Sequence, residues 1–252
     1  MRLKNKNVLI TGAGGLLGNS LALSFIKQGA SLWLADSNKN SLYDMARKLP
    51  KDKILGLLTF DVSSPEQVQT AFAKINKKKG SLDVLINNAG IGVFEPFWER
   101  DFKDFMNVMA VNAGGTFLCI KEALTIMKDN GGGSIVNIGS IYGIVSSDPS
   151  IYTDCSRMNS EAYSASKAAV IQLTKYFSVH AIEHNVRVNC VSPGGIFNNQ
   201  GKDFIKNYSS KTPMGRLADY QEITGAITFL SSDEASYING QNLVIDGGLT
   251  AW

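Results

Sequence analysis

A strand-like segment followed by a glycine-rich turn constrains the fold of this chain more than any other feature. Residues 7–11 (NVLIT) are apolar, and small and apolar residues recur with helical period after the turn, up to residue 28. Glycines in such a turn let backbone N–H groups approach a pyrophosphate, and the N-terminus of the next helix attracts its charge. We therefore predict a dinucleotide site at this turn. Its expected cofactor-binding residues are Gly12, Gly15, Leu16, Leu17 and Gly18.

Strand-like and helix-like segments continue to alternate along the 252 residues. Strands are predicted at 31–35, 54–60, 82–86 and 242–245, and one of the intervening helices opens with Pro65 in its first turn. Strands that alternate with helices pair in parallel through right-handed crossovers. The sequence therefore predicts an α/β fold with a doubly wound parallel sheet of about seven strands, flanked by helices on both faces, in one domain spanning 1–252.

Polar residues stand at the carboxyl ends of the predicted strands, which is where ligands bind in sheets of this type. Asp36, Asp61 and Asn88 occupy three of these ends, and the glycine turn follows a fourth. We expect these residues to contact the cofactor. Their neighbours Val62, Ala89 and Gly90 belong to the same expected set.

The residue at the end of the second strand bears on which dinucleotide binds. The carboxylate of Asp36 would accept hydrogen bonds from the adenosine ribose and would repel a 2′-phosphate. Ser37 and Asn38 follow it, and the glycine turn holds no Arg or Lys, so NAD is favoured over NADP. Lys39 is the one nearby cation that would weaken this preference.

Tyr163 and Lys167 are separated by about one helical turn within residues 161–169 (EAYSASKAA). Residues four apart lie on one face of a helix, so the phenol and the ammonium can address one point in space. A cation held nearby favours the phenolate, which makes the phenol a candidate general acid or base. Of the eight tyrosines, only Tyr163 has a lysine four residues later. Taken alone, the pair also fits a solvated helix face, so the other motifs decide.

Composition excludes several classes of partner. The net charge of +3 is small and evenly spread, which does not favour nucleic acid, and the basic run at 77–79 suits a helix end near Gly80. No apolar run approaches the roughly 18 residues that a membrane helix needs. Three widely spaced cysteines indicate reduced thiols. We expect a soluble, cytoplasmic protein without membrane contact.

The histidines do not indicate a metal site. His180 and His184 lie four apart on a predicted helix, which is a spacing that two metal ligands can have. The sequence offers no third ligand, and ordinary surface histidines explain the pair. We predict no bound metal.

Taken together, the motifs resemble those of the short-chain dehydrogenase/reductase family, in its compact branch. The resemblance rests on residues along nearly the whole chain: Thr11-Gly12 with Gly15 and Gly18, Asn87-Asn88-Ala89-Gly90, Asn112, Ile138-Gly139-Ser140, Tyr163 with Lys167, 189–194 (NCVSPG) and 245–248 (IDGG). It implies a single-domain Rossmann fold and NAD(P)-dependent hydride transfer between a secondary alcohol and a ketone. It also implies a homo-oligomer, a homotetramer or a homodimer.

The same resemblance assigns roles to four residues. Tyr163 is the expected general acid/base, and Lys167 assists it and binds the nicotinamide ribose. Ser140 is expected to orient the substrate oxygen, and Asn112 to hold a water that links Lys167 to solvent. The expected cofactor contacts also include Tyr163, Lys167, Pro193, Gly194, Ile196 and Asn198.

Two departures from the family pattern leave alternatives open. Leu16 stands where this branch usually has a glycine, and the resulting spacing is that of the longer, sugar-nucleotide-modifying branch. A sugar-nucleotide epimerase or dehydratase that retains NAD is therefore one alternative, although the chain lacks the longer C-terminal substrate domain. A 3-oxoacyl-type reductase and a nonenzymatic NAD-binding protein are others. Asn198 replaces a usual threonine, and its amide can make comparable hydrogen bonds.

The third departure is a long polar insert at about 144–160, between Ser140 and Tyr163. Both its ends are expected catalytic residues, so it must begin and finish at the substrate pocket. Arg157 is the residue best suited to a phosphate or carboxylate, which suggests a polar substrate such as a sugar or sugar phosphate. The alternative is a flap that packs between subunits. We also expect a substrate lid around 196–216, polar and mobile, and a subunit contact at Trp252.

Overall fold

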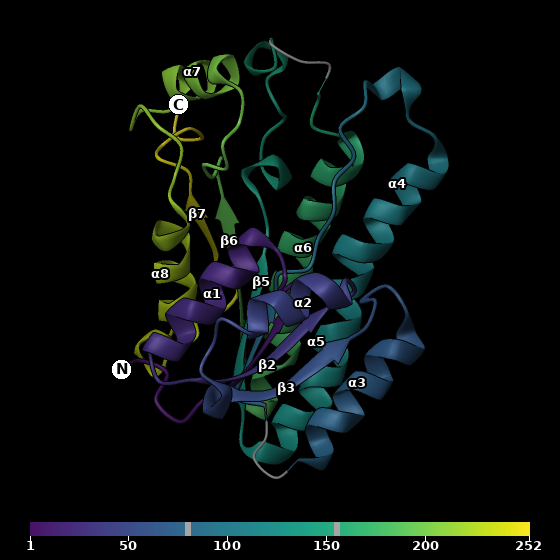
Figure 1. Cartoon of the computed structure of the whole chain (residues 1–252), viewed down its shortest axis with the longest axis vertical. Helices are drawn as coiled ribbons and strands as arrows, with labels where there is room; N and C mark the ends of the chain where they lie inside the picture. Colours follow the sequence, from purple (N-terminus) through teal and green to yellow (C-terminus); the bar gives the residue numbers. More distant parts are fainter. Residues whose placement is uncertain (79–81, 154–156) are drawn as a thin grey trace.

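Seven parallel strands form one sheet in the computed structural model, which describes residues 1–78, 82–153 and 157–252 (Figure 1). The strand order is β3-β2-β1-β4-β5-β6-β7, which confirms the predicted doubly wound sheet. The strands are β1 (Asn7–Thr11), β2 (Ser31–Asp36), β3 (Ile54–Thr59), β4 (Val84–Asn87), β5 (Gly133–Ile138), β6 (Val186–Pro193) and β7 (Asn242–Ile245). The order reverses direction between β1 and β4, and such a switch point opens a crevice beyond the strand ends.

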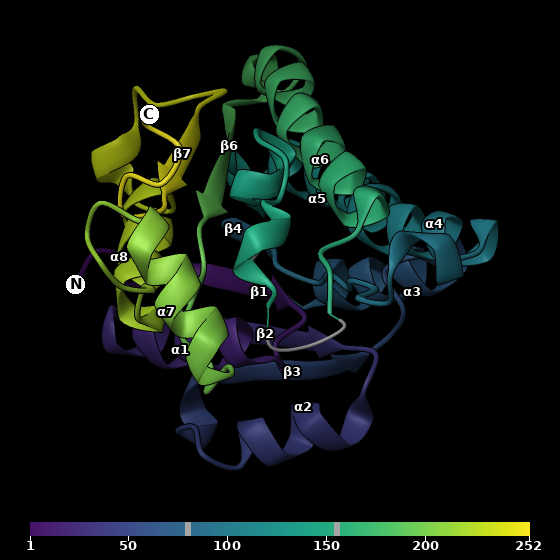
Figure 2. The same cartoon turned by 90° about the horizontal axis from the view of Figure 1, so that it is seen from above.

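Helices cover both faces of the sheet (Figures 1 and 2). They are α1 (Leu16–Lys27), α2 (Lys39–Ala46), α3 (Pro65–Lys77), α4 (Phe102–Met109), α5 (Gly115–Met127), α6 (Glu161–His180), α7 (Lys202–Lys211) and α8 (Tyr220–Leu230). Buried residues of α1, α2 and α8 share one core cluster, and those of α3 and α5 share another. In the described segments, no helix is long and apolar enough to cross a membrane.

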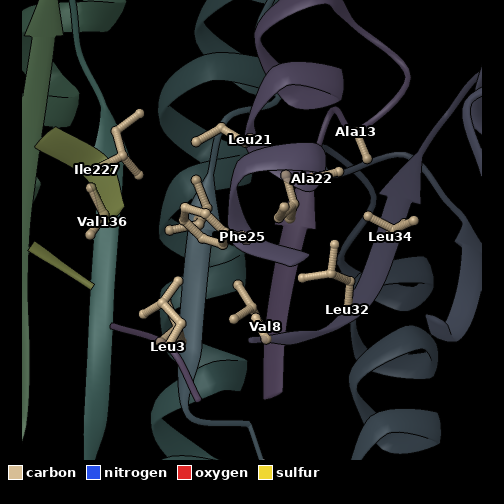
Figure 3. Packing of buried hydrophobic residues seen from close by; sticks show 14 of the residues in the cluster. Leu3, Val8, Ala13, Leu21, Ala22, Phe25, Leu32, Leu34, Val136 and Ile227 are labelled. Atoms are coloured by element: carbon tan, nitrogen blue, oxygen red, sulfur yellow. The ribbon is translucent and has the colours of Figure 1, made fainter. Parts of the chain in front are cut away.

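Alternating side chains of the strands supply the two cores. Val8 and Ile10 of β1 face one cluster and Leu9 faces the other, and all three are fully buried. Figure 3 shows the first cluster, where Leu21 and Phe25 of α1 pack against the sheet. Because both faces are covered, the strands read as continuous apolar runs rather than as alternating ones.

The predicted lid contains a regular helix, which the polar sequence did not indicate. Residues 202–211 form α7, beyond the carboxyl end of β6 (Figure 1). Tyr208 of this helix is 2% exposed and packs with Ile151 of the insert and with Leu217. The helix is thus held by contacts with residues distant in the sequence, which explains why local periodicity gave no signal.

Two short stretches lie outside the described residues. The first covers 79–81, so Lys79 and the expected helix end at Gly80 are not described, and α3 ends at Lys77. The second covers 154–156, which holds Asp154, Cys155 and Ser156 of the insert. The other two cysteines, Cys119 and Cys190, are buried free thiols.

Candidate active site

A cleft of about 470 Å³ opens at the switch point between β1 and β4. It collects predicted residues from the carboxyl ends of β1, β2, β3 and β4. Ten of them line it: Gly12, Gly15, Leu16, Leu17, Asp36, Asp61, Val62, Asn88, Ala89 and Gly90. Gly18, in α1, lies outside the lining. Pro193 is the last residue of β6, and Gly194, Ile196 and Asn198 follow this strand, also outside the lining.

The glycines of the turn serve different purposes. Gly12 has φ +63°, and a Cβ at this position would lie 2.8 Å from the Cα of Ala89, so the fold itself requires glycine. A Cβ at Gly15 would meet only the carbonyl oxygen of Gly12, at the ordinary distance of 3.4 Å. The space beside Gly15 in the cleft is therefore not filled by other protein atoms. This cradle fits a pyrophosphate at the N-terminus of α1.

Asn88 ties the glycine turn to β4. Its Nδ2 donates to the carbonyl oxygens of Thr11 and Gly12, each over 3.0 Å. The N–H groups of Asn88 and Ala89 both donate to Thr11 Oγ1 over 3.1 Å. These bonds satisfy buried polar groups and fix the two halves of the cleft against each other.

Two carboxylates lie along the cleft, at the ends of β2 and β3. Asp36 accepts hydrogen bonds from the N–H groups of Gly14, at 2.9 Å, and Asn38, at 2.8 Å. Asp61 accepts from both the N–H and the hydroxyl of Ser63. Within the described part of the chain, no Arg or Lys lines this cleft. Lys39 Nζ lies 5.8 Å from the ring centroid of Tyr43, on α2.

Lys167 lies next to the cleft, beside Gly90. Its side chain is buried, and Nζ donates to the carbonyl oxygen of Ile138 at the end of β5, over 2.7 Å. A Cβ built on Gly90 would lie 3.5 Å from this Nζ, so the cofactor cleft and the lysine meet at Gly90. The ammonium lies 5.5 Å from the ring centroid of Tyr163, one helical turn earlier.

Ser140 and Tyr163 lie on neighbouring elements beside Lys167. Ser140 follows β5 by two residues and is buried, and its Oγ accepts from the N–H of Tyr142 over 3.2 Å. The turn after it packs so closely on α6 that a Cβ at Gly143 would lie 2.7 Å from the backbone of Lys167. The predicted serine, tyrosine and lysine are therefore brought to one side of the cleft.

Asn112 lies in a π-helical turn, Ala110–Gly114, which joins α4 to α5. Its side chain is buried and makes three hydrogen bonds: Oδ1 accepts from Ile91 N over 2.8 Å, and Nδ2 donates over 2.9 Å to both Ile91 O and Ser166 Oγ. Single-turn π-bulges occur frequently at functional sites. Here the side chain joins the loop after β4 to α6.

Arg157 and Asn198, two expected ligand contacts, are exposed at the rim. The guanidinium of Arg157 lies 4.0 Å from the ring centroid of Phe94. Phe94 borders the active site, because a Cβ at Gly92 would lie 3.2 Å from the Phe94 ring and 3.6 Å from the Tyr163 ring. Asn198 donates its backbone N–H to Gln200 Oε1 over 2.8 Å, and its side chain lines no part of the cleft.

Sequence reasoning missed several residues at the site. Ile91 and Val111 line the cleft. Ile91 directly follows the predicted Gly90, and Val111 directly precedes the predicted Asn112, so their position in the sequence was the available signal. Tyr142, two residues after Ser140, had a similar signal. Tyr152 of the insert had none, because only the fold brings its hydroxyl to 3.4 Å from that of Tyr142.

Comparisons with known proteins agree with this geometry. A family model described as enoyl-(acyl carrier protein) reductase matches residues 12–250. Glucose 1-dehydrogenase of Gluconobacter oxydans is 34% identical over 100% of this chain and 94% of its own length. A short-chain dehydrogenase from Leptospira borgpetersenii, solved with bound NAD⁺, is 37% identical with a TM-score of 0.90, over 99% of this chain and 94% of that one.

A third relative extends the comparison to another cofactor. The structure of a gluconate 5-dehydrogenase from Burkholderia cenocepacia, in complex with NADP and tartrate, is 29% identical with a TM-score of 0.88, over 100% of this chain and 97% of that one. The doubly wound sheet, with its cleft at the switch point, is the architecture of a dinucleotide-binding protein. The chain belongs to the short-chain dehydrogenase/reductase family and is an oxidoreductase that acts on CH–OH groups with NAD(P).

Proposed function

We propose that this protein interconverts a sugar-like secondary alcohol and its ketone, with NAD as the cofactor and Ser140, Tyr163 and Lys167 as catalytic residues. The observation that carries the proposal is the junction at Gly90. Gly90 lines the cleft, and Lys167 Nζ lies 3.5 Å from the position of a Cβ on this residue. This geometry supports the proposal that the phenol of Tyr163, one helical turn from this lysine, transfers the proton.

The chain's own residues supply position and a proton acceptor. Ser140 Oγ orients the substrate hydroxyl, and Tyr163 Oη removes its proton as the carbonyl forms. Lys167, held by Ile138 O, keeps its ammonium 5.5 Å from the centroid of the Tyr163 ring. NAD, held by the residues that line the cleft, would supply the acceptor for the hydride of the carbinol carbon. Alcohol and NAD⁺ thus give ketone, NADH and one proton.

Asn112 acts as a positioning residue in this proposal. Its three side-chain hydrogen bonds hold Ile91, beside the cleft, and Ser166, beside Lys167. A water bound near this residue would link Lys167 to solvent, which is the role that the family resemblance implies. The cofactor role of Pro193, Gly194, Ile196 and Asn198 belongs to the same proposal, on the side of the site that follows β6.

The preference for NAD rests on Asp36. Its carboxylate already accepts two backbone hydrogen bonds and lines the cleft, so a 2′-phosphate would meet a fixed negative charge. Lys39, the cation that would offset this charge, lies over the Tyr43 ring instead.

The proposed substrate is polar and carries an anionic group such as a carboxylate or phosphate. Arg157 supports this assignment, because its guanidinium stacks on Phe94 beside the Tyr163 ring. Among the described residues, no carboxylate lies within ion-pair distance of Arg157. The relative named gluconate 5-dehydrogenase, whose structure holds tartrate, supports a carboxylate, and the relative named glucose 1-dehydrogenase supports a polyhydroxy compound.

A panel assay tests the proposal. We would measure the absorbance of reduced nicotinamide with NAD and with NADP, using meso-2,3-butanediol, D-sorbitol, D-gluconate and sorbitol 6-phosphate as substrates. The proposal predicts NAD reduction with at least one of the polyhydroxy compounds. Reduction of NADP alone would overturn the cofactor assignment, and no turnover with any compound would overturn the function.

We also propose that the chain works as one domain, with 196–216 as substrate cover, in a homodimer or homotetramer. Exposed apolar residues support the oligomer: Tyr176 and Val179 on α6, Ile182 just after it, and Trp252 at the end of the chain. Light scattering coupled to size-exclusion chromatography measures the oligomeric state, and a monomer at micromolar concentration would contradict it.

A further inference from the structure

The insert brings the phenol of Tyr152 next to that of Tyr142, beside Ser140. Tyr142 follows Ser140 and bonds to it through its N–H, and its hydroxyl lies 3.4 Å from that of Tyr152. Burial raises the pKa of Tyr142 far above its ordinary value, and the phenols of Tyr152, Tyr208 and Tyr163 raise it further. Tyr142 therefore keeps its proton at neutral pH and remains a hydrogen-bond donor.

Apolar contacts between the insert and α7 hold Tyr152 in this place. Ile151 is 2% exposed and packs with Tyr208, which is equally buried. The ring of Tyr152 lies 5.5 Å from that of Phe204, also on α7. Aromatic pairs at this separation contribute beyond the area that they bury.

Polar contacts fix both ends of the same short segment to α7. At one end, Lys211 Nζ lies 2.6 Å from Asp148 Oδ2. At the other, Asn207 Nδ2 donates to Thr153 Oγ1 over 2.7 Å. Residues 148–153 and α7 thus form one cover, which lies beyond the carboxyl end of β6 (Figure 1).

The separation of the two phenols suits a third hydroxyl. Hydrogen bonds between hydroxyl groups are most often 2.7–2.8 Å long, so the 3.4 Å contact of Tyr142 and Tyr152 is long and weak. Each hydroxyl can donate one bond and accept two. A substrate hydroxyl that bonds to both would replace one poor contact with two good ones.

We propose that Tyr152 determines substrate specificity, by binding together with Tyr142 a substrate hydroxyl that is not the one oxidised. This inference rests on the proposed function and adds the recognition of the substrate's other carbons to it. Polyhydroxy substrates gain the contact, whereas a secondary alcohol with a single hydroxyl, such as 2-butanol, has no second hydroxyl to make it. The insert therefore selects sugar-like compounds over small alcohols.

Kinetics of Tyr152→Phe test the inference, with Tyr237→Phe as the matched control, because Tyr237 is fully exposed. Loss of one neutral hydrogen bond predicts a KM for D-sorbitol or D-gluconate raised about 3- to 10-fold, with kcat changed less than about twofold. The KM for 2-butanol should stay within about twofold. An unchanged KM for the polyhydroxy compounds, or an equal rise for 2-butanol, would overturn the inference.

A second variant separates binding from folding. If both phenols bind one hydroxyl, Tyr142→Phe gives the same substrate pattern, and the double variant raises KM by less than the product of the single effects. A purely structural pair would instead lower the midpoint of thermal unfolding and kcat for every substrate. Wild-type enzyme that reduces no NAD with any compound would overturn the proposed function and this inference together. Normal wild-type turnover, with the same KM for the polyhydroxy compounds in Tyr152→Phe as in the wild type, would overturn the inference alone.

Discussion

Lys167 Nζ donates a hydrogen bond of 2.7 Å to the carbonyl oxygen of Ile138, and the lysine is only 5% exposed. This bond joins α6 to the carboxyl end of β5. Ser140 lies two residues beyond Ile138, and Tyr163 lies one turn before Lys167. One buried ammonium therefore sets the relative positions of the serine and the tyrosine to which we assign the chemistry.

Replacing Tyr163 with phenylalanine should remove the proton acceptor and leave the fold intact. General acid–base groups contribute about 10²- to 10⁴-fold to rate, so kcat should fall by at least about 100-fold. NADH binding, followed by the fluorescence of the reduced nicotinamide, should change less than about threefold. Tyr43→Phe, on the exposed side of α2, is the control. Activity of Tyr163→Phe above a tenth of the wild-type rate would speak against its role.

The two glycines of the turn should separate stability from cofactor binding. Gly12→Ala places a side chain at φ +63° against Ala89, so it should destabilise the protein by about 1–2 kcal/mol or more. Gly15→Ala has room in the fold and should unfold like the wild type, but it should weaken NADH binding. Thermal unfolding and fluorescence titration measure the two effects. Equal NADH affinity of Gly15→Ala and wild type would exclude the pyrophosphate from this cradle.

Asp36→Ser should shift the enzyme toward NADP. The variant removes the charge that would face a 2′-phosphate, so the ratio of kcat/KM for NADP to that for NAD should rise about tenfold or more. Initial rates with each cofactor at a fixed substrate concentration give this ratio. Asp44→Ser, which removes an exposed carboxylate from α2, should leave it unchanged. A ratio that stays constant in Asp36→Ser would place the ribose elsewhere.

Arg157→Gln should affect charged substrates only. A hydrogen bond to a charged group contributes about 1.5–3 kcal/mol, so KM for D-gluconate or sorbitol 6-phosphate should rise about tenfold or more. The KM for neutral D-sorbitol should stay within about twofold, and Arg47→Gln, which changes an exposed arginine at the end of α2, serves as control. Equal effects on neutral and anionic substrates would show that Arg157 acts through packing on Phe94.

The contact of the insert with α7 should be insensitive to pH above about 4. A hydrogen bond from Lys211, assisted by Ser150, lowers the pKa of Asp148 to about 2. A depressed carboxyl pKa stabilises the folded state fully above the unfolded value of about 4, and this contribution is lost as pH falls toward 2. Hydrogen exchange of the Ile151 and Tyr152 amides should therefore show constant protection between pH 5 and 8, after correction for intrinsic rates.

Asp148→Asn checks the same contact at neutral pH. Both partners are partly exposed, so the ion pair contributes only about 0.2–1 kcal/mol. Exchange at Ile151 and Tyr152 should accelerate by about five-fold or less in this variant. Protection that is lost already near pH 5 in the wild type would contradict the assignment of Asp148.

Much of the fold could be predicted because its signals are local. The run of residues 242–245 is β7 as expected, and the glycine turn and Pro65 mark the starts of α1 and α3. The π-helical turn at Asn112 and the helix α7 had no such signal. Both depend on contacts across the fold: Asn112 with Ile91, and α7 with the insert.

The candidate site likewise contains residues that the sequence predicts and residues that only the folded structure brings together. Residues at strand ends, such as Asp36 and Asn88, converge because parallel strands end at one edge of the sheet. Tyr152 reaches Tyr142 only because Ile151 and Thr153 are docked on α7. Spacing along the chain carries no information about that docking.

Transfer of isotope tests the central claim most directly. A polyhydroxy alcohol that turns over in the panel, deuterated at its reacting carbinol carbon, would be incubated with the enzyme and NAD⁺, and the NADH formed would be analysed by mass spectrometry. The account predicts one deuterium in each NADH produced by the wild type, and labelled NADH formed at least about 100-fold more slowly with Tyr163→Phe. Substrate converted to product without labelled NADH accumulating would contradict it and would favour an epimerase that retains its cofactor.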